Sequence, residues 1–173
     1  GSELWTWLTL RRLGAVGDEA LDRARRLAAL VPEATADAAE YELVAGASGA
    51  IVPLLQLAAV TGEQQWTDIA AHVGEMVCEA ALTRDIGVNW PTVRWPGGLG
   101  GCAHGAPGIG WALARLALAT GGERAAGTAR AAFAFEESCY DPMAGGWRDL
   151  REIEPGLTAN AWCHGSVGIA LTQ

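Results

Sequence analysis

The sequence has few basic residues, no long apolar run and no closely spaced pair of cysteines. Only 12 Lys and Arg residues oppose 20 Asp and Glu residues, which gives a net charge of −8 and disfavours nucleic acid as a partner. No run of about 18 apolar residues occurs, so membrane association is not expected. Residues 1–5 show no basic segment followed by an apolar one, so we expect no secretory signal here and a cytoplasmic protein.

The four cysteines lie far apart, which excludes a dense disulfide framework. A chain of 173 residues can bury a core without disulfides, so we expect reduced thiols, with a metal ligand among them. Cys78 and Cys139 fall in or just after predicted helices and are interpreted as structural. Cys102 is interpreted as a small residue after the turn 97–101, although it lies close enough to His104 to reach the same rim.

The composition favours an all-α fold. Half of the residues are hydrophobic, and Ala and Leu, which are strong helix formers, outnumber the β-branched residues. The 23 glycines are many for a helical protein, so they should lie at helix ends or at close backbone contacts.

A short glycine motif recurs with a period of about sixty residues. Its leading glycines, Gly46, Gly105 and Gly165, are 59 and 60 residues apart, and an apolar stretch follows each of them. A fixed period of this kind indicates an array of one supersecondary unit. The three copies are Gly46–Ile51, His104–Ile109 and Cys163–Ile169.

Each unit is predicted to be a helical hairpin with a buried inner helix and an amphipathic outer helix. Breaks at Gly62 and Gly121 suit the C-terminal ends of inner helices. Trp5, Trp66 and Trp111 fall on helices and are expected in the core. The predicted inner helices are Glu3–Leu13, Ala47–Val60, Ala106–Ala119 and the start of one in Gly165–Gln173. The predicted outer helices are Asp18–Val31, Glu63–Leu82 and Glu123–Glu137.

Details of the first outer helix follow from its ends and its charges. Asp18 is a plausible N-cap, and Pro32 should stop the helix. The pairs Glu19/Arg23 and Asp22/Arg26 have the spacing of helical ion pairs. The segments 83–103 and 138–162 are long Gly- and Trp-containing connections, and connections of that length are often functional.

Titratable residues stand at the same place before two of the motifs. His104 precedes the second motif, and Cys163 and His164 precede the third, so hairpins stacked in register would bring all three to one rim. Each residue also has a structural interpretation. The G-x-x-G turn can simply allow close packing of inner helices, His104 can be a satisfied histidine at a helix N-terminus, and a free cysteine is usually a small core residue.

At this point the residues resemble a known family. The chain is similar to the cyclase (LanC-like) domain of the class II lanthipeptide, or lanthionine, synthetases, and the agreement in order and spacing covers nearly the whole chain. The paired A-H-G-x-x-G-I and W-C-H-G motifs are specific, and the W-x-D-L-R loop favours the class II branch. The matching stretches are Ala45–Ile51, Ala103–Leu113, Gly146–Arg151 and Asn160–Gly165.

The resemblance implies an α/α toroid of seven inner and seven outer helices with zinc in its centre. It also implies an enzyme that closes thioether rings in a lanthipeptide precursor peptide. A cysteine thiol of the peptide adds to dehydroalanine or dehydrobutyrine and yields lanthionine or methyllanthionine. Residues 1–173 would be a single partial cyclase domain of about three hairpins plus the start of another inner helix, and the parent class carries a dehydratase domain as well.

The resemblance also assigns site residues. Cys163 matches the first zinc-binding cysteine, and His104 matches the histidine proposed as the acid and base. Glu42 stands where the family usually has an aspartate. His164 matches a position close to the metal that is not a ligand. The remaining zinc ligands are an adjacent Cys-His or Cys-Cys pair of a later repeat, expected beyond Gln173, so we expect the chain to be a central fragment that is inactive alone.

Three alternatives remain open from the sequence. Cys163 and His164 could themselves be the later ligand pair. The chain could be a non-catalytic α/α repeat scaffold that binds a peptide. It could also be a carbohydrate-active α/α barrel, but that class needs paired carboxylates at the cavity mouth, and Glu42 is the only acid near the motifs.

Overall fold

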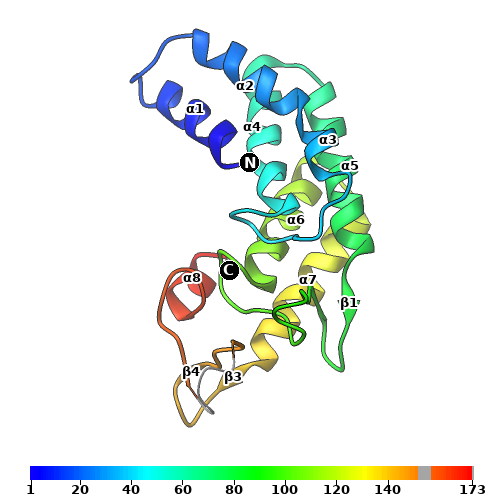
Figure 1. The fold of residues 1–173 in the computed structure, drawn as a ribbon, viewed down its shortest axis with the longest axis vertical. Coiled ribbons are helices and arrows are strands. Elements are labelled where there is room, and N and C mark those ends of the chain that lie inside the picture. Colours follow the sequence, from blue (N-terminus) through cyan, green and yellow to red (C-terminus); the bar gives the residue numbers. More distant parts are fainter. Residues whose placement is uncertain (152–156, 173) are drawn as a thin grey trace.

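The helices pair into hairpins, and the hairpins follow one another along an arc (Figure 1). The computed structural model describes residues 1–151 and 157–172. The predicted connection 138–162 therefore contains a stretch, 152–156, that lies outside the described residues, as does Gln173 at the end of the last predicted helix. The helices are α1 (Ser2–Arg12), α2 (Glu19–Ala29), α3 (Val31–Thr35), the 3-10 turn η1 (Ala47–Ala50), α4 (Ile51–Thr61), α5 (Gln65–Glu79), α6 (Ala106–Thr120), α7 (Glu123–Ser138) and α8 (Ser166–Thr172).

The arc has an inner and an outer layer. Helices α1, α4, α6 and α8 lie on the concave side, and each contacts the next one in the series. Helices α2, α5 and α7 lie outside and pack against α1, α4 and α6 as their hairpin partners. The predicted all-α class and its hairpin repeats are therefore confirmed. Closure of such an array into a toroid remains a prediction.

The core lies between the two layers. Leu54 and Leu57 of α4 and Ile109 and Leu113 of α6 are almost fully buried against the outer helices. Gly74 of α5 lets α5 approach α6, because a methyl group at this glycine would overlap the Leu116 side chain. Burial of such side chains, at about 1.5–3 kcal/mol each, is the main force that holds the layers together.

The inner helices end where their glycines predict. Gly62 and Gly121 follow α4 and α6 in the left-handed conformation, with φ values of 72° and 73°. Each glycine N–H donates to the carbonyl four residues earlier, in Ala58 and Ala117. Glycine adopts this conformation without the steric strain of a side chain, so it terminates the helix and starts the turn to the outer helix.

The ends of the first outer helix differ from the prediction. Asp18 stands at the N-cap position of α2, but its carboxylate makes no capping hydrogen bond and instead accepts from Arg11 of α1. Pro32 lies in the first turn of the short helix α3, where its missing N–H breaks no helical hydrogen bond. It therefore starts a new helix. Asp22 pairs with Arg25, one residue short of the predicted partner.

The two long connections each contain a small hairpin. The first is formed by β1 (Leu82–Thr83) and β2 (Val88–Asn89), and the second by β3 (Tyr140–Asp141) and β4 (Gly146–Trp147). Buried Asn89 ties the first connection together, because its amide donates to the Gly97 carbonyl (2.7 Å) and its oxygen accepts from Arg84 (2.8 Å). Both connections lead directly into the motif loops.

Among the described helices, α1 to α8 are all too short or too polar to cross a bilayer.

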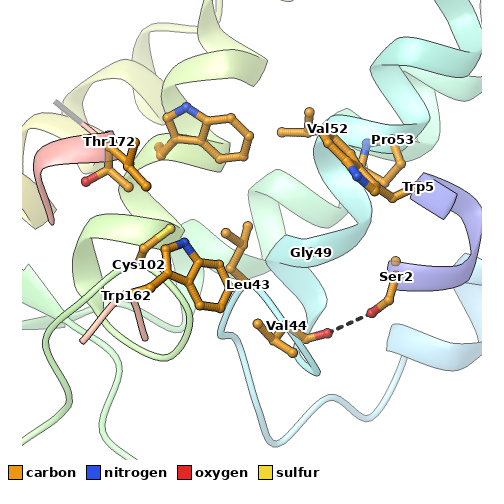
Figure 2. A pocket seen from close by; sticks show the side chains of 13 residues that line it. Ser2, Trp5, Leu43, Val44, Gly49, Val52, Pro53, Cys102, Trp162 and Thr172 are labelled. Carbon is orange, nitrogen blue, oxygen red and sulfur yellow. Dashed lines mark hydrogen bonds between the residues drawn. The ribbon is translucent and has the colours of Figure 1, made fainter. Parts of the chain in front are cut away.

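The expectation that three helical tryptophans lie in the core is right for Trp66, which is buried. It is wrong for Trp5, which is 40% exposed. Trp111 is half-buried and packs against the core, and both Trp5 and Trp111 line a pocket on the concave side of the arc (Figure 2).

Candidate functional site

Three loops with one local design lead into the inner helices. In each, the N–H of the first residue after the motif glycine donates to a carbonyl seven residues earlier, at 3.0 to 3.1 Å. The second and third loops also share a hydrogen bond from the motif glycine N–H to the carbonyl four residues earlier. The bonds that span seven residues run from the N–H groups of Ala47, Ala106 and Ser166 to the carbonyls of Glu40, Leu99 and Ala159. The loops therefore present equivalent positions from successive repeats to one rim.

The second glycine of each motif is required by its own loop. A methyl group on it would overlap the backbone carbonyl of the residue six positions earlier, and this holds in all three repeats. Gly168 of the inner helix α8 also abuts the Cβ of Cys102 in the loop of the previous repeat, so this glycine additionally allows close packing between repeats. The glycine and carbonyl pairs are Gly49 with Leu43, Gly108 with Cys102, and Gly168 with Trp162.

The loops bring together three titratable side chains. The imidazole rings of His104 and His164 stack, with centroids 4.8 Å apart and an interplanar angle of 24°. The Glu42 carboxylate contacts Nδ1 of His104, and the Glu42 side chain is only 11% exposed. Glu42, His104 and His164 come from three successive repeats, so the array itself builds this cluster. The motif register predicts that His104 and His164 meet, whereas Glu42 was expected here only from the family resemblance.

Backbone contacts fix the three loops against one another. The Leu43 N–H donates to the Ala103 carbonyl at 3.1 Å, which joins the first loop to the second. Gly101 has a φ of 88° and packs directly on the backbone of Cys163 and His164, which joins the second loop to the third. A side chain at Gly101 would be strained and would also push the third loop away.

An ion pair between buried Asp149 and half-buried Arg151 stands beside the third loop. Arg151 donates to both carboxylate oxygens of Asp149, and its Nε lies 2.9 Å from Oδ1. These hydrogen bonds lower the pKa of Asp149, which is 7% exposed. Burial lowers the pKa of His164, and the nearby Arg151 charge adds to this effect, so the neutral imidazole is favoured.

A pocket of about 480 Å³ lies next to this cluster, on the concave side of the arc (Figure 2). The motif loops contribute Leu43, Cys102 and Trp162 to its lining, and the inner helices contribute Val52 and Trp111. Burial raises the pKa of the Cys102 thiol, so this side chain is neutral at pH 7.

Comparison with known proteins decides the family. The family model described as lanthionine synthetase C-like protein matches residues 5–173.

The chain belongs to the lanthionine synthetase C-like family.

No curated protein and no solved structure matches the chain significantly. The family match supports a cyclase-type function of the lanthionine synthetase kind, as the motif resemblance predicted.

The resemblance implies a zinc ion, and some of the described residues of this chain carry donors that could bind it. Cys163 is half-buried next to His164, whose buried Nδ1 has no hydrogen-bond partner among residues 1–151 and 157–172. A thiol and an imidazole nitrogen are both donor types that suit zinc. In that same part of the chain, however, no three His, Cys, Asp or Glu side chains are grouped so as to hold a metal ion. The described residues therefore offer donor atoms of the right kind but too few of them to form a complete zinc site.

Sequence reasoning missed Glu136, which lies behind the His104 loop. Its Oε1 accepts from the Gly101 N–H at 3.4 Å, and its Oε2 has no partner within the described part of the chain. Burial raises the pKa of this carboxyl to about 7. Helical spacing was the available signal, because Glu136 continues the buried α7 face of Ala125, Ala129 and Ala132.

Proposed function

We propose that this chain is part of a zinc-dependent lanthionine synthetase cyclase of the class II type. The enzyme adds cysteine thiols of a precursor peptide to dehydroalanine or dehydrobutyrine residues. The observation that supports the proposal is the cluster of Glu42, His104 and His164, built from three successive repeats beside Cys163 in a chain of this family.

The reaction needs one proton to be removed and one to be delivered. The sulfur forms a bond to the β-carbon of the dehydro residue, and the π electrons of the double bond move into an enolate. A proton must leave the thiol before this step, and a proton must reach the α-carbon after it. A group that shuttles one proton between the two places satisfies both needs and typically contributes about 10²–10⁴-fold in rate.

His104 is suited to that shuttle because Glu42 fixes its tautomer. A carboxylate at Nδ1 holds a proton on that nitrogen and leaves Nε2 with a free lone pair. In our proposal, Nε2 accepts the thiol proton, and the Glu42 carboxylate stabilises the resulting imidazolium. Nε2 then returns the proton to the α-carbon. His164 stacks on His104 and holds the plane of its ring.

Zinc would be held by Cys163 together with ligands from outside the described residues. A bound zinc ion keeps a substrate sulfur ionised near neutral pH. Because a three-ligand site loses most of its affinity when one ligand remains, residues 1–173 alone are expected to bind zinc weakly.

The wider assignment follows the family and belongs to the same proposal. Residues 1–173 form a partial cyclase domain, its partners are a lanthipeptide precursor and a synthetase that also carries a dehydratase domain, and the reaction takes place in the cytoplasm. A glycosidase would need two free carboxylates at the cavity mouth, whereas Glu42 is engaged with His104, Asp149 is engaged with Arg151, and Glu136 is buried behind the loop.

A cyclisation assay with matched histidine variants tests the proposal. The full-length protein is incubated with a dehydrated precursor peptide, and free thiols are then alkylated and counted by mass spectrometry. His104→Ala should lower kcat by about 10²–10⁴-fold. His72→Ala, an exposed histidine on the outer helix α5, should leave kcat unchanged. Wild-type kcat in His104→Ala would reject the proton shuttle, and free thiols with the wild-type protein would favour a non-catalytic scaffold.

A further inference from the structure

The pocket on the concave side is apolar and open to solvent. Its described lining side chains carry no formal charge, and tryptophans from α1, α6 and the third motif loop take part in it (Figure 2). Trp162 is 49% exposed and Leu171 is 66% exposed. Large apolar side chains gathered on one concave surface usually mark a binding site, because their exposure to water is unfavourable.

The pocket and the polar cluster share the same three loops. Leu43, Cys102 and Trp162 occupy one position of the repeat, three residues before the motif glycine, and all three line the pocket. Their near neighbours in sequence make up the candidate site: Glu42 precedes Leu43, His104 lies two residues after Cys102, and Cys163 follows Trp162. The pocket therefore begins within two residues of each loop's functional side chain.

We propose that this pocket binds a hydrophobic side chain of the precursor peptide, from a residue next to the cysteine that reacts. The inference rests on the cyclase function proposed above and adds a substrate preference to it. Consecutive Cα atoms of a peptide are about 3.8 Å apart. When the sulfur of the reacting cysteine is held near Cys163, the residue next to that cysteine therefore lies close to Trp162, and its side chain can enter the pocket.

The size and chemistry of the pocket select this occupant. Its volume of about 480 Å³ is within the range of pockets that enclose small organic groups, roughly 300–1,000 Å³. A carboxylate or ammonium group would lose its hydration there without finding a lining side chain of opposite charge. A Phe or Leu side chain would instead cover the exposed indoles, and each buried methylene adds roughly 0.8 kcal/mol.

The test uses two dehydroalanine-containing peptides that differ only in the residue before the cysteine, Phe in one and Asp in the other. Cyclisation by the full-length protein gives KM and kcat for each peptide. In parallel, calorimetry measures the Kd of versions in which Ser replaces the cysteine. The wild-type protein should prefer the Phe peptide by about tenfold in KM and Kd, the scale of discrimination that an apolar pocket provides.

Two pocket variants and one matched control locate the effect. Leu171→Glu adds a charge at the exposed edge of the pocket, and Trp111→Ala removes part of its wall. Both should raise KM and Kd for the Phe peptide about tenfold and leave those for the Asp peptide nearly unchanged. Leu118→Glu makes the same change at an 81% exposed leucine of α6 outside the pocket and should affect neither peptide.

The possible failures are distinct. Equal Kd values for the two peptides with the wild-type protein would overturn the pocket inference, while their cyclisation would leave the proposed function standing. Pocket variants that raise the Kd of both peptides alike would also overturn it, because the effect would then not depend on the side chain next to the cysteine. A wild-type protein that cyclises neither peptide would contradict the proposed function, and the Kd values would still decide whether the pocket binds the Phe side chain.

Discussion

Replacing Gly108 with Ala tests the loop design on which the site depends. A methyl group at this position would overlap the carbonyl oxygen of Cys102. That oxygen belongs to backbone that cannot easily yield, because the N–H groups of Gly105 and Ala106 bond the carbonyls of Gly101 and Leu99 at 3.1 and 3.0 Å. Overpacking against such a wall costs about 2–3 kcal/mol, near the upper end of the usual range.

The net effect is smaller because alanine favours a helix. Gly→Ala within a helix stabilises by about 1 kcal/mol, so Gly108→Ala should lower the free energy of unfolding by about 1–2 kcal/mol. Gly127→Ala is the matched control, since Gly127 lies within α7 and a methyl group there meets nothing within 4 Å. It should raise the free energy of unfolding by about 1 kcal/mol.

Thermal unfolding followed by far-ultraviolet circular dichroism measures both variants. A change of 1 kcal/mol shifts Tm by about 2–4 °C in a protein of this size. Gly108→Ala should therefore lower Tm, and Gly127→Ala should raise it. If Gly108→Ala raised Tm as much as Gly127→Ala, the Cys102 carbonyl would not be the reason for this glycine, and the shared loop geometry would be wrong.

Two further predictions concern buried carboxyl groups. The pKa of Glu136 is about 7 in the fold against 4.5 in the unfolded chain, so the folded state binds an extra proton between these values and stability falls as pH rises toward 7. Glu136→Gln should remove this decline, which amounts to about 2–3 kcal/mol between pH 5 and pH 8 in urea titrations; an unchanged decline would mean that Glu136 is ionised in the fold. Arg151→Ala should cost about 1 kcal/mol at pH 7, a modest value because solvent reaches this side chain. Since Arg151 lowers the pKa of Asp149, that loss should fade as pH falls below about 4, and a loss that persists at acid pH would indicate a packing role.

The sequence predicted the hairpins because their signals are local. The period of the motifs, the apolar inner helices and the stops at Gly62 and Gly121 depend on residues close together in the chain. The register of the repeats also predicted that His104 and His164 would come to one rim, where they stack. Repetition makes such a long-range contact predictable, because equivalent residues of stacked units become neighbours.

Contacts between different elements were not predictable in the same way. Asp18 had the local signature of a helix cap, but a strong charged partner, Arg11 of the preceding helix, takes its carboxylate. Glu136 follows the buried face of α7, yet only the structure shows that it faces the Gly101 turn. Trp5 lies on a helix as expected, but the curvature of the array places it at a pocket.

Zinc content after dialysis tests the central claim most directly. The full-length protein, its Cys163→Ala variant and its Cys78→Ala variant are compared, because Cys78 is a buried cysteine of α5 that lies away from the motif loops. The account predicts about one zinc ion per molecule in the wild-type protein and in Cys78→Ala, and almost none in Cys163→Ala. A Cys163→Ala protein that keeps its zinc and still closes thioether rings would contradict it.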